Sequence, residues 1–288
     1  MRWKDLRRSS NVRDVRGAGG GGGMRMPTGR GGRVGGGLGA IVIVVLVLIF
    51  GGPDALLQLL GGSGGVVPSG GQTGAPLTAN DDDSQFVAAI LGSTEDTWGA
   101  LFEQAGERYQ APELTLFDGS VQSACGYASA ASGPFYCPGD RRVYLDTAFF
   151  RDLAALGGPG DFAAAYVIGH EVGHHVQTLL GTSDNVRAAQ ARGDETAANR
   201  LQVAMELQAD CFAGVWANHA NQRNSMLESG DVEEGLAAAQ AIGDDRLQGN
   251  AGRRVTPDSF THGSSADRQR WLTRGLESGD PAACDTFK

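Results

Sequence analysis

An apolar run with three polar residues at fixed positions constrains most strongly how this chain can fold. Residues 165–180 read AYVIGHEVGHHVQTLL, in which His170, Glu171 and His174 form the pattern H-E-x-x-H. An α-helix rises about 1.5 Å per residue with roughly 3.6 residues per turn, so positions four apart lie on nearly the same face. The pattern therefore predicts a buried helix that presents two imidazoles side by side.

Two imidazoles at this spacing are typical of a zinc site. Neutral histidine nitrogen is a preferred zinc ligand, and a catalytic zinc site combines three protein ligands with one position open to water. Glu171, next to the first imidazole, is placed to take a proton from that water and pass it to a leaving group. We therefore expect Zn²⁺ at His170 and His174, Glu171 as the catalytic base, and a third ligand from elsewhere in the chain.

A second pair of acidic residues supplies the candidate third ligand. Glu206 and Asp210 occur in MELQAD, within a run from 195 to 220 whose apolar residues recur at helical spacing. We assign Glu206 to the metal and Asp210 to the distal N–H of a ligand histidine, a contact that fixes the tautomer and orientation of the ring. Glu-x-x-x-Asp alone is more often a solvated helix face, and its combination with H-E-x-x-H is what favours a metal site.

Two glycines inside the predicted helix indicate a close neighbour. Gly169 and Gly173 lie within the motif segment, and a glycine in a helix interior destabilises it by roughly 0.5–1 kcal/mol relative to alanine. A second helix that packs closely on this face would offset that loss. We therefore expect a helix–helix contact at these positions.

The N-terminal part of the chain differs from the rest in charge and hydropathy. Residues 1–33 contain nine Lys or Arg and two Asp, although the whole chain has a net charge of −9. Residues 34–52 carry no charge, and 38–50 read LGAIVIVVLVLIF. A stretch of this length just spans a bilayer, and positive flanking charge stays on the cytoplasmic side. We expect a single transmembrane anchor at 34–52, a cytoplasmic tail at 1–33 and a domain outside the cytoplasm.

A cleaved signal peptide and a buried core helix are the alternatives for this hydrophobic segment. The basic region is long and no A-x-A cleavage site follows Phe50, which argues against a signal peptide. Three glycines at 35–37 weaken the prediction that this stretch is a membrane-spanning helix. The glycine run at 19–23 is more typical of a disordered tail near anionic lipid than of a nucleic-acid site, so we expect no nucleic-acid partner.

Composition divides the remaining chain into a linker and one folded domain. Residues 53–80 are rich in Gly, Pro and Ser and have no hydrophobic period, so we expect the domain at 81–288. Helical patterns dominate the domain, with short β-prone segments among them. The predicted fold class is α+β, mainly helical, with a small sheet over the H-E-x-x-H helix and a single transmembrane helix before it. We expect 143–145 to form an edge strand that could pair with an extended substrate.

A histidine near the C-terminus is the second candidate for chemistry. His262 lies in SFTHGSSADRQRWL, just before a predicted helix start. A positively polarised side chain near zinc would stabilise an oxyanion, so we assign His262 as a catalytic residue. A surface or capping role is the alternative, and Tyr144 and Tyr166 are the other candidate donors. We expect His175 and His219 to be structural.

The four cysteines, Cys125, Cys137, Cys211 and Cys284, are even in number and contain no C-x-x-C pair. Disulfides fit this pattern on the outer side of an anchor better than a second zinc site does. Three pairings are possible. The simplest joins Cys125 to Cys137 and Cys211 to Cys284, because the first bond closes a local loop and the second ties the C-terminus to the helix of Glu206.

Several segments together resemble the bacterial putative neutral zinc metallopeptidase family. They are ACGYA, GPFYCPGD, VYLD, VIGHEVGHHVQ, MELQADCFAG, IGDDRLQ, DSFTHGSS and GDPAACDTF, together with the hydrophobic segment before them. The resemblance implies a zincin-like metallopeptidase domain of the gluzincin type, with two histidines and one glutamate on zinc. It agrees with His170, His174 and Glu206 as ligands and with Glu171 as the catalytic residue.

These features predict a membrane-anchored, extracytoplasmic zinc-dependent endopeptidase that acts on proteins or peptides and contacts the bilayer through 34–52. A zinc amidase acting on cell-wall peptides is the enzymatic alternative. A zinc-stabilised envelope scaffold protein, from a different class, would need the metal but not Glu171. A purely structural zinc site usually has four protein ligands, so Glu171 beside the two histidines favours the enzyme.

Overall fold

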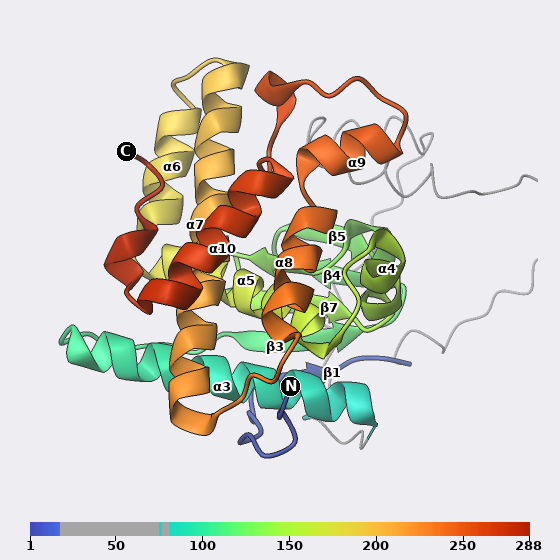
Figure 1. Cartoon of the computed structure of the whole chain (residues 1–288), viewed down its shortest axis with the longest axis vertical. Coiled ribbons are helices and arrows are strands. Elements are labelled where there is room, and N and C mark those ends of the chain that lie inside the picture. Colours follow the sequence, from blue (N-terminus) through green and yellow to red (C-terminus); the bar gives the residue numbers. More distant parts are fainter. Residues whose placement is uncertain (18–74, 77–80) are drawn as a thin grey trace, which may run out of the picture.

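The computed structural model describes residues 1–17, 75–76 and 81–288 (Figure 1). Short 3₁₀ turns occupy Ala130–Ser132, Pro257–Ser259 and Pro281–Cys284. The other elements are, in chain order, β1 (Val12–Asp14), β2 (Ala75–Pro76), α3 (Asp82–Gln104), β3 (Glu113–Phe117), β4 (Ser120–Ser123), β5 (Gly126–Ser129), β6 (Phe135–Cys137), β7 (Arg142–Asp146), α4 (Phe149–Leu156), α5 (Asp161–Leu179), α6 (Thr182–Gln190), α7 (Glu195–Asn224), α8 (Asp231–Ala241), α9 (Asp244–Asn250) and α10 (Ser265–Ser278). This is a mainly helical α+β architecture, as predicted.

Helix α5 carries the H-E-x-x-H motif and lies at the centre of the fold, next to the long helix α7 (Figure 1). Most residues of α5 are buried, so its polar side chains need partners within the protein. The helix contact expected from its glycines is present. A Cβ on Gly169 would lie 2.7 Å from the Trp216 ring, and a Cβ on Gly173 would lie 3.0 Å from the Ala209 carbonyl oxygen. Glycine at both positions therefore lets α7 approach α5 closely.

A second close crossing sets α10 against α7. A Cβ on Gly214 of α7 would collide with the backbone of α10, and a Cβ on Gly275 of α10 would collide with the Cys211 carbonyl oxygen. Backbone atoms cannot turn aside as the end of a flexible side chain can, so this crossing requires glycine on both helices. It sets the second half of α10 against the middle of α7, and from the first turn of α10 the Arg268 side chain reaches Asp210.

Within the described residues, the larger sheet has the strand order β2-β1-β3-β7-β6, and β4 and β5 form a separate antiparallel hairpin. Strand β3 runs parallel to β1 and β7, while β2 and β6 run antiparallel to their neighbours. The prediction of an edge strand at 143–145 is wrong. Strand β7 is internal because it pairs with β3 on one side and with β6, the strand just before it in the chain, on the other. The edge strand beside α5 is therefore β6.

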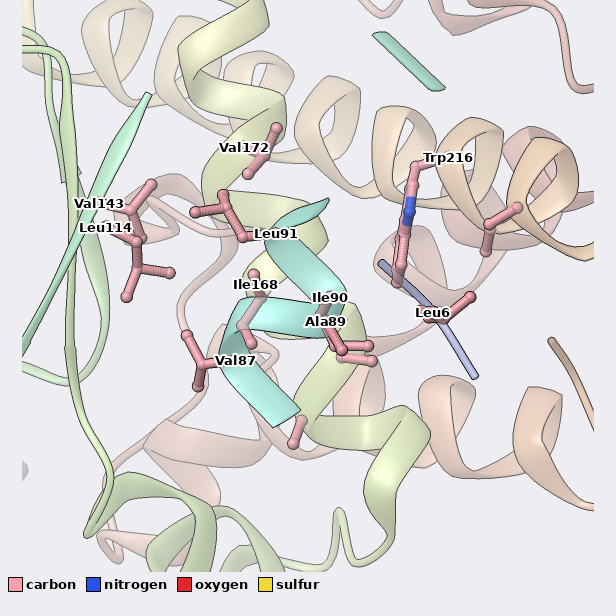
Figure 2. Packing of buried hydrophobic residues seen from close by; sticks show 14 of the residues in the cluster. Leu6, Val87, Ala89, Ile90, Leu91, Leu114, Val143, Ile168, Val172 and Trp216 are labelled. Carbon is pink, nitrogen blue, oxygen red and sulfur yellow. The ribbon is translucent and has the colours of Figure 1, made fainter. Parts of the chain in front are cut away.

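The main hydrophobic core lies between α3, the sheet, α5 and α7, and Figure 2 shows how their side chains interdigitate. Helix α3 lies in the middle of this cluster and packs against all three of the others. Every residue in the following selection is at most 1% exposed: Val87, Ile90, Leu91, Leu114, Val143, Ile168, Val172 and Trp216. The core therefore holds α5 in place along the face opposite its polar residues.

Residues 1–17 pack on the domain. Leu6 and Val12 are buried in the main core, and β1 pairs in parallel with β3. A strand and core residues that the sequence assigned to a basic tail at 1–33 thus complete the domain predicted at 81–288. The physical reason is that the apolar residues of this short segment are too few to give a hydrophobic period, yet they suffice to extend a sheet that already exists.

The predicted membrane topology needs correction. Residues 34–52 lie outside the described residues, and in the part of the chain that the structure describes no helix is both long and apolar enough to cross a bilayer. In addition, a single span at 34–52 would put 1–17 and 81–288 on opposite sides of a membrane, whereas the two pack together. The predictions of a transmembrane helix and of a single-pass location are therefore wrong. The domain boundaries, including the linker at 53–80, stay predictions.

Both cysteine pairs favoured by the sequence are at bonding distance. The S–S distance is 2.01 Å between Cys125 and Cys137 and 1.98 Å between Cys211 and Cys284. The first bond closes the excursion that leads into β6. The second joins the C-terminal turn to α7 and thereby fastens the chain that follows α10.

We predict that Gly275→Ala lowers the free energy of unfolding by about 3 kcal/mol, because its methyl group would meet the backbone of α7 and overpack the crossing. The matched control is Gly99→Ala in α3, where an added Cβ meets nothing within 4 Å. This control should stabilise the protein by about 0.5–1 kcal/mol. Chemical denaturation of both variants measures the effect, and equal stability of the two would contradict this account of the crossing.

Candidate metal centre

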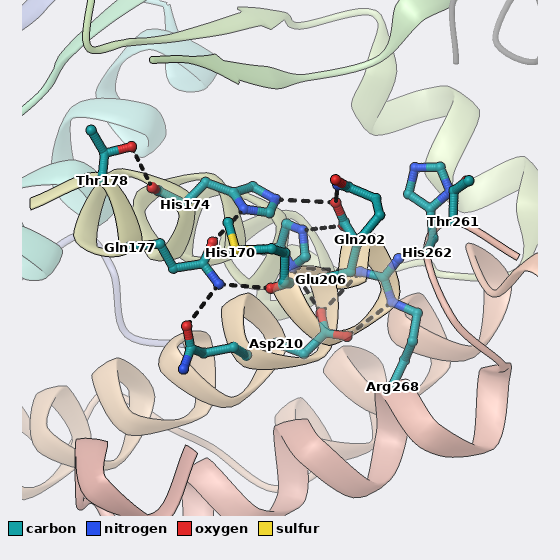
Figure 3. Close-up of polar contacts among 12 residues, drawn as sticks. His170, His174, Gln177, Thr178, Gln202, Glu206, Asp210, Thr261, His262 and Arg268 are labelled. Carbon is teal, nitrogen blue, oxygen red and sulfur yellow. Dashed lines mark hydrogen bonds and ion pairs between the residues drawn. The ribbon is translucent and has the colours of Figure 1, made fainter. Parts of the chain in front are cut away.

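The three predicted metal ligands converge between α5 and α7 (Figure 3). The distance from His170 Nε2 to Glu206 Oε2 is 3.2 Å, and that from His174 Nε2 to Glu206 Oε1 is 3.6 Å. One ligand atom from each of the three side chains lies within 4.8 Å of the others. The two imidazole rings are nearly perpendicular, at 86°, with centroids 4.7 Å apart. The spacing along α5 and the close approach of α7 together produce this cluster.

Each imidazole is held through its other nitrogen. His170 Nδ1 lies 2.8 Å from Asp210 Oδ1, the contact expected for this carboxylate, and His174 Nδ1 lies 2.9 Å from Gln177 Oε1. The Gln177 amide is fixed in turn, because its Nε2 donates to the Met205 carbonyl oxygen at 2.7 Å. In the neutral form of each ring, donation through Nδ1 leaves the lone pair of Nε2 for the centre of the cluster, which is the tautomer that a metal requires.

The electrostatics of the cluster favour a cation at its centre. Burial opposes ionisation of Glu206, but the positive charge of His174 and hydrogen bonds from both imidazoles hold its pKa well below the usual range. Burial also opposes the charged form of His170, but the Asp210 and Glu206 carboxylates outweigh it and raise its pKa to about 10. A buried carboxylate of this kind needs a positive partner. A divalent metal on neutral imidazoles supplies that charge.

Glu171 lies beside the cluster but is not one of its three ligands. It is 8% exposed, and burial raises its pKa against the opposing influence of positive charge on His174 and His170. The backbone of Tyr136 in β6 has a smaller influence, which lowers the pKa of Glu171. The groups that set the pKa of Glu171 therefore come from β6 as well as from α5.

The structure holds His262 in place through a carboxylate that the sequence did not single out. Asp244 Oδ1 accepts from His262 Nδ1 at 3.2 Å. Asp244 Oδ2 accepts from the backbone N–H groups of Thr261, His262 and Gly263 at 2.7, 2.6 and 3.1 Å. Burial would raise the pKa of Asp244, but these contacts with the histidine and the backbone lower it. One carboxylate thus fixes both the loop and the ring.

A cavity of about 330 Å³ adjoins this loop and is lined by Gln190, Ala198, Asn199, Gln202, Thr261 and His262. Gln202 links the cavity to the metal ligands, since its Nε2 donates to Glu206 Oε1 at 3.0 Å. The charge of His262 also contributes to the lowered pKa of Glu206. His262 therefore lines the cavity and also influences a metal ligand electrostatically.

The other candidates have structural partners. Tyr144 donates to Asp140 at 2.7 Å and Tyr166 donates to Asp210 at 2.5 Å, so neither hydroxyl is directed at an incoming carbonyl. His175 contacts the Tyr136 hydroxyl and the Gln110 carbonyl oxygen, and His219 bonds the Gly279 carbonyl oxygen. Burial lowers the pKa of His175 to about 4. Both histidines have the kind of environment expected of structural residues.

A second acidic cluster in the described residues is formed by Asp161, Asp231 and Glu234. The amino group of Met1 lies 2.9 Å from both carboxylate oxygens of Asp161 and 3.3 Å from Asp231 Oδ1. These carboxylates therefore already have a cationic partner. The imidazole-containing cluster is the better candidate for a metal.

Sequence reasoning missed Gln177, Gln202, Asp244 and Arg268 as parts of the site. Gln177 lies three residues after His174 and Gln202 four before Glu206, so helical spacing could have indicated both. Asp244 precedes His262 by eighteen residues, and nothing in the intervening sequence indicates their contact. Arg268 reaches the site through the crossing of α7 and α10, which is a tertiary feature.

The chain matches, over residues 1–287, the family described as putative neutral zinc metallopeptidase. The uncharacterized protein YpfJ of Escherichia coli strain K12 is 49% identical over 303 residues, which cover 100% of this chain and 99% of that protein. The uncharacterized protein Rv2575 of Mycobacterium tuberculosis strain H37Rv is 40% identical over 249 residues, covering 77% of this chain and 83% of that protein. The comparison with solved structures gives no match.

The chain belongs to the putative neutral zinc metallopeptidase family. The resemblance stated from the sequence motifs is thereby confirmed. At the level of the family, the protein is a zinc metallopeptidase that acts on a protein or peptide substrate. The family implies zinc, and the residues present fit it, because a buried imidazole, a half-buried imidazole and a buried carboxylate converge with the correct nitrogens facing inward.

We predict that Glu206→Gln reduces bound zinc from about one ion per chain to a small fraction of that, because the amide lacks the negative charge of the third ligand. Elemental analysis after dialysis against a zinc buffer measures this. The matched control is Glu195→Gln, an exposed residue in the first turn of the same helix, which should keep wild-type zinc content. Full zinc content in Glu206→Gln would remove Glu206 from the centre.

Proposed function

We propose that the chain is a zinc-dependent endopeptidase in which Glu171 is the general base. The observation that carries this proposal is the position of Glu171, which is buried next to the three clustered ligands without belonging to them. A structural zinc site has no use for an additional buried carboxylate. Burial of such a charge destabilises the fold, so its presence indicates a role in chemistry. Three ligands also leave the open position that a hydrolytic site needs.

His170, His174 and Glu206 are the residues that would hold the metal. Zinc bound there supplies Lewis-acid chemistry, since it polarises a carbonyl and lowers the pKa of water to about 7. Glu171 takes a proton from the attacking water and passes it to the leaving amine. Asp210 and Gln177 keep the imidazoles in the correct tautomer throughout.

His262 stabilises the negative charge that develops on the carbonyl oxygen of the substrate. Asp244 accepts from Nδ1, so Nε2 on the opposite edge of the ring is the nitrogen available to the cavity that His262 lines. Donation through Nε2 needs the imidazolium form of the ring, and a donor already fixed in position needs no rearrangement when the charge appears. The three backbone bonds to Asp244 provide that fixation.

An extended peptide would bind along the edge strand β6. Strand β6 is the outer strand of the described sheet on the side of α5, and the Tyr136 ring in it contacts His175 of that helix. Addition of a peptide strand to such an edge uses backbone hydrogen bonds and therefore tolerates many sequences.

The decisive experiment compares the full-length wild type with Glu171→Gln. Both should bind zinc equally, and the variant should cleave an unfolded protein such as casein about 10²–10⁴-fold more slowly, the usual range for loss of a general base. Undiminished cleavage by Glu171→Gln would contradict the assignment. Cleavage of purified peptidoglycan in place of casein would point to the amidase, and zinc binding without any cleavage to the scaffold.

We further predict that His262→Ala lowers kcat by about 10²-fold or more while zinc content stays constant, by comparison with the loss of one oxyanion donor. The matched control is His219→Gln, because His219 bonds the Gly279 carbonyl oxygen away from the cluster. Its kcat should equal that of the wild type. An unchanged kcat in His262→Ala would show that the loop histidine has only a structural role.

A further inference from the structure

We infer that Arg268 and Tyr166 form a buried clamp that fixes Asp210 and, through it, the ring of His170 for metal binding. This inference rests on the proposed function, because it concerns the same metal centre. Arg268 is in α10, Tyr166 in α5 and Asp210 in α7, so the clamp joins three helices. Figure 3 shows the Arg268 side chain reaching Asp210 beside the ring of His170, and Arg268 Nη2 lies 3.5 Å from His170 Nδ1.

Four donor groups converge on the Asp210 carboxylate. Its Oδ1 accepts from His170 Nδ1 at 2.8 Å, from the Tyr166 hydroxyl at 2.5 Å and from Arg268 Nη2 at 2.9 Å. Its Oδ2 accepts from Arg268 Nε at 3.0 Å. Arg268 Nη2 also lies 3.2 Å from the Tyr166 hydroxyl oxygen. An ionised carboxylate can accept about four such bonds, so the group is saturated and cannot rotate.

The clamp is fully enclosed. Asp210 is 0% exposed, Tyr166 is 0% and Arg268 is 1%. An ion pair at this depth contributes little net stability, since desolvation of both charges offsets most of their attraction. Apolar side chains of similar size would stabilise the crossing of α7 and α10 as well or better. The presence of the clamp is therefore better explained by what it does to His170.

The geometry requires arginine in particular. The guanidinium contacts both carboxylate oxygens through two different nitrogens, Nε and Nη2, and this fork fixes the plane of Asp210 as well as its position. A lysine ammonium would keep the charge but could not fix that plane. Since His170 donates to Oδ1, the plane of the carboxylate sets the direction in which the imidazole presents Nε2 to Glu206.

The second imidazole provides an internal comparison. His174 is oriented by a neutral amide, that of Gln177, and its side chain is 17% exposed, whereas that of His170 is 7% exposed. The charged clamp therefore acts on one ligand only. We expect its loss to change how His170 is presented to the metal while His174 and Glu206 stay in place.

The test measures zinc affinity of the full chain by competition with a chromophoric chelator in wild type, Arg268→Lys and Tyr166→Phe. Loss of a group that orients a ligand typically weakens metal binding about 10–100-fold, and we expect this for Arg268→Lys and a smaller, several-fold loss for Tyr166→Phe. Absorption spectra with Co²⁺ in place of zinc should shift in both variants, because they report ligand geometry. The matched control is Arg223→Lys, since Arg223 contacts Thr97 and the Asp96 carbonyl oxygen away from the cluster.

The outcomes separate this inference from the proposed function. Zinc affinity within twofold of wild type in Arg268→Lys, with an unchanged Co²⁺ spectrum, would overturn the clamp even if the wild type cleaves casein. If Arg268→Lys binds zinc more weakly than the wild type but the wild type cleaves neither substrate, the clamp stands and the proposed peptidase function is removed. Tyr166→Phe removes one hydroxyl and no charge, so it keeps the test decisive if Arg268→Lys does not fold.

Discussion

The close packing of α5 on α7 is the constraint on which the rest of the site depends. Gly169 and Gly173 let the helix backbones approach, and this approach carries Glu206 and Asp210 to the imidazoles of α5. With side chains at the two glycine positions, the helices would stand farther apart and the carboxylate could not reach both rings. The missing side chain of glycine, although it destabilises the helix, is therefore the condition for a three-ligand centre.

Burial of this centre explains why so many side chains around it are polar. Each group in the cluster loses water and must be paired inside the protein. The pairing extends outward in order, from the imidazoles to Asp210 and Gln177, and from these to Arg268 and the Met205 carbonyl oxygen. The fold thus holds the inward-facing nitrogens and the ionised Glu206 in a state suited to one divalent cation. The family of zinc metallopeptidases to which the chain belongs is consistent with this chemistry.

The sequence predicted those parts of the site that depend on local spacing. His170 and His174 lie four apart on one helix, as do Glu206 and Asp210, so helical geometry alone pairs them. Asp244 and Arg268 escaped prediction because they reach the site through a loop and a helix crossing, which no local period reveals.

Two features of the fold were predicted wrongly for similar reasons. Internal strand β7 was taken for an edge because its neighbour β6 is only three residues long and was not predicted. The hydropathy of 34–52 indicated a membrane span, but hydropathy could not show that residues 1–17 pack on the domain, which excludes the predicted topology.

The central claim is that one zinc ion binds between α5 and α7, and anomalous scattering from crystals grown with zinc tests it most directly. Difference maps from data on either side of the zinc absorption edge locate the ion without reference to activity. The account predicts a peak bonded to His170 Nε2, His174 Nε2 and the Glu206 carboxylate. A peak at Asp161, Asp231 and Glu234 instead, with none between the imidazoles, would contradict it.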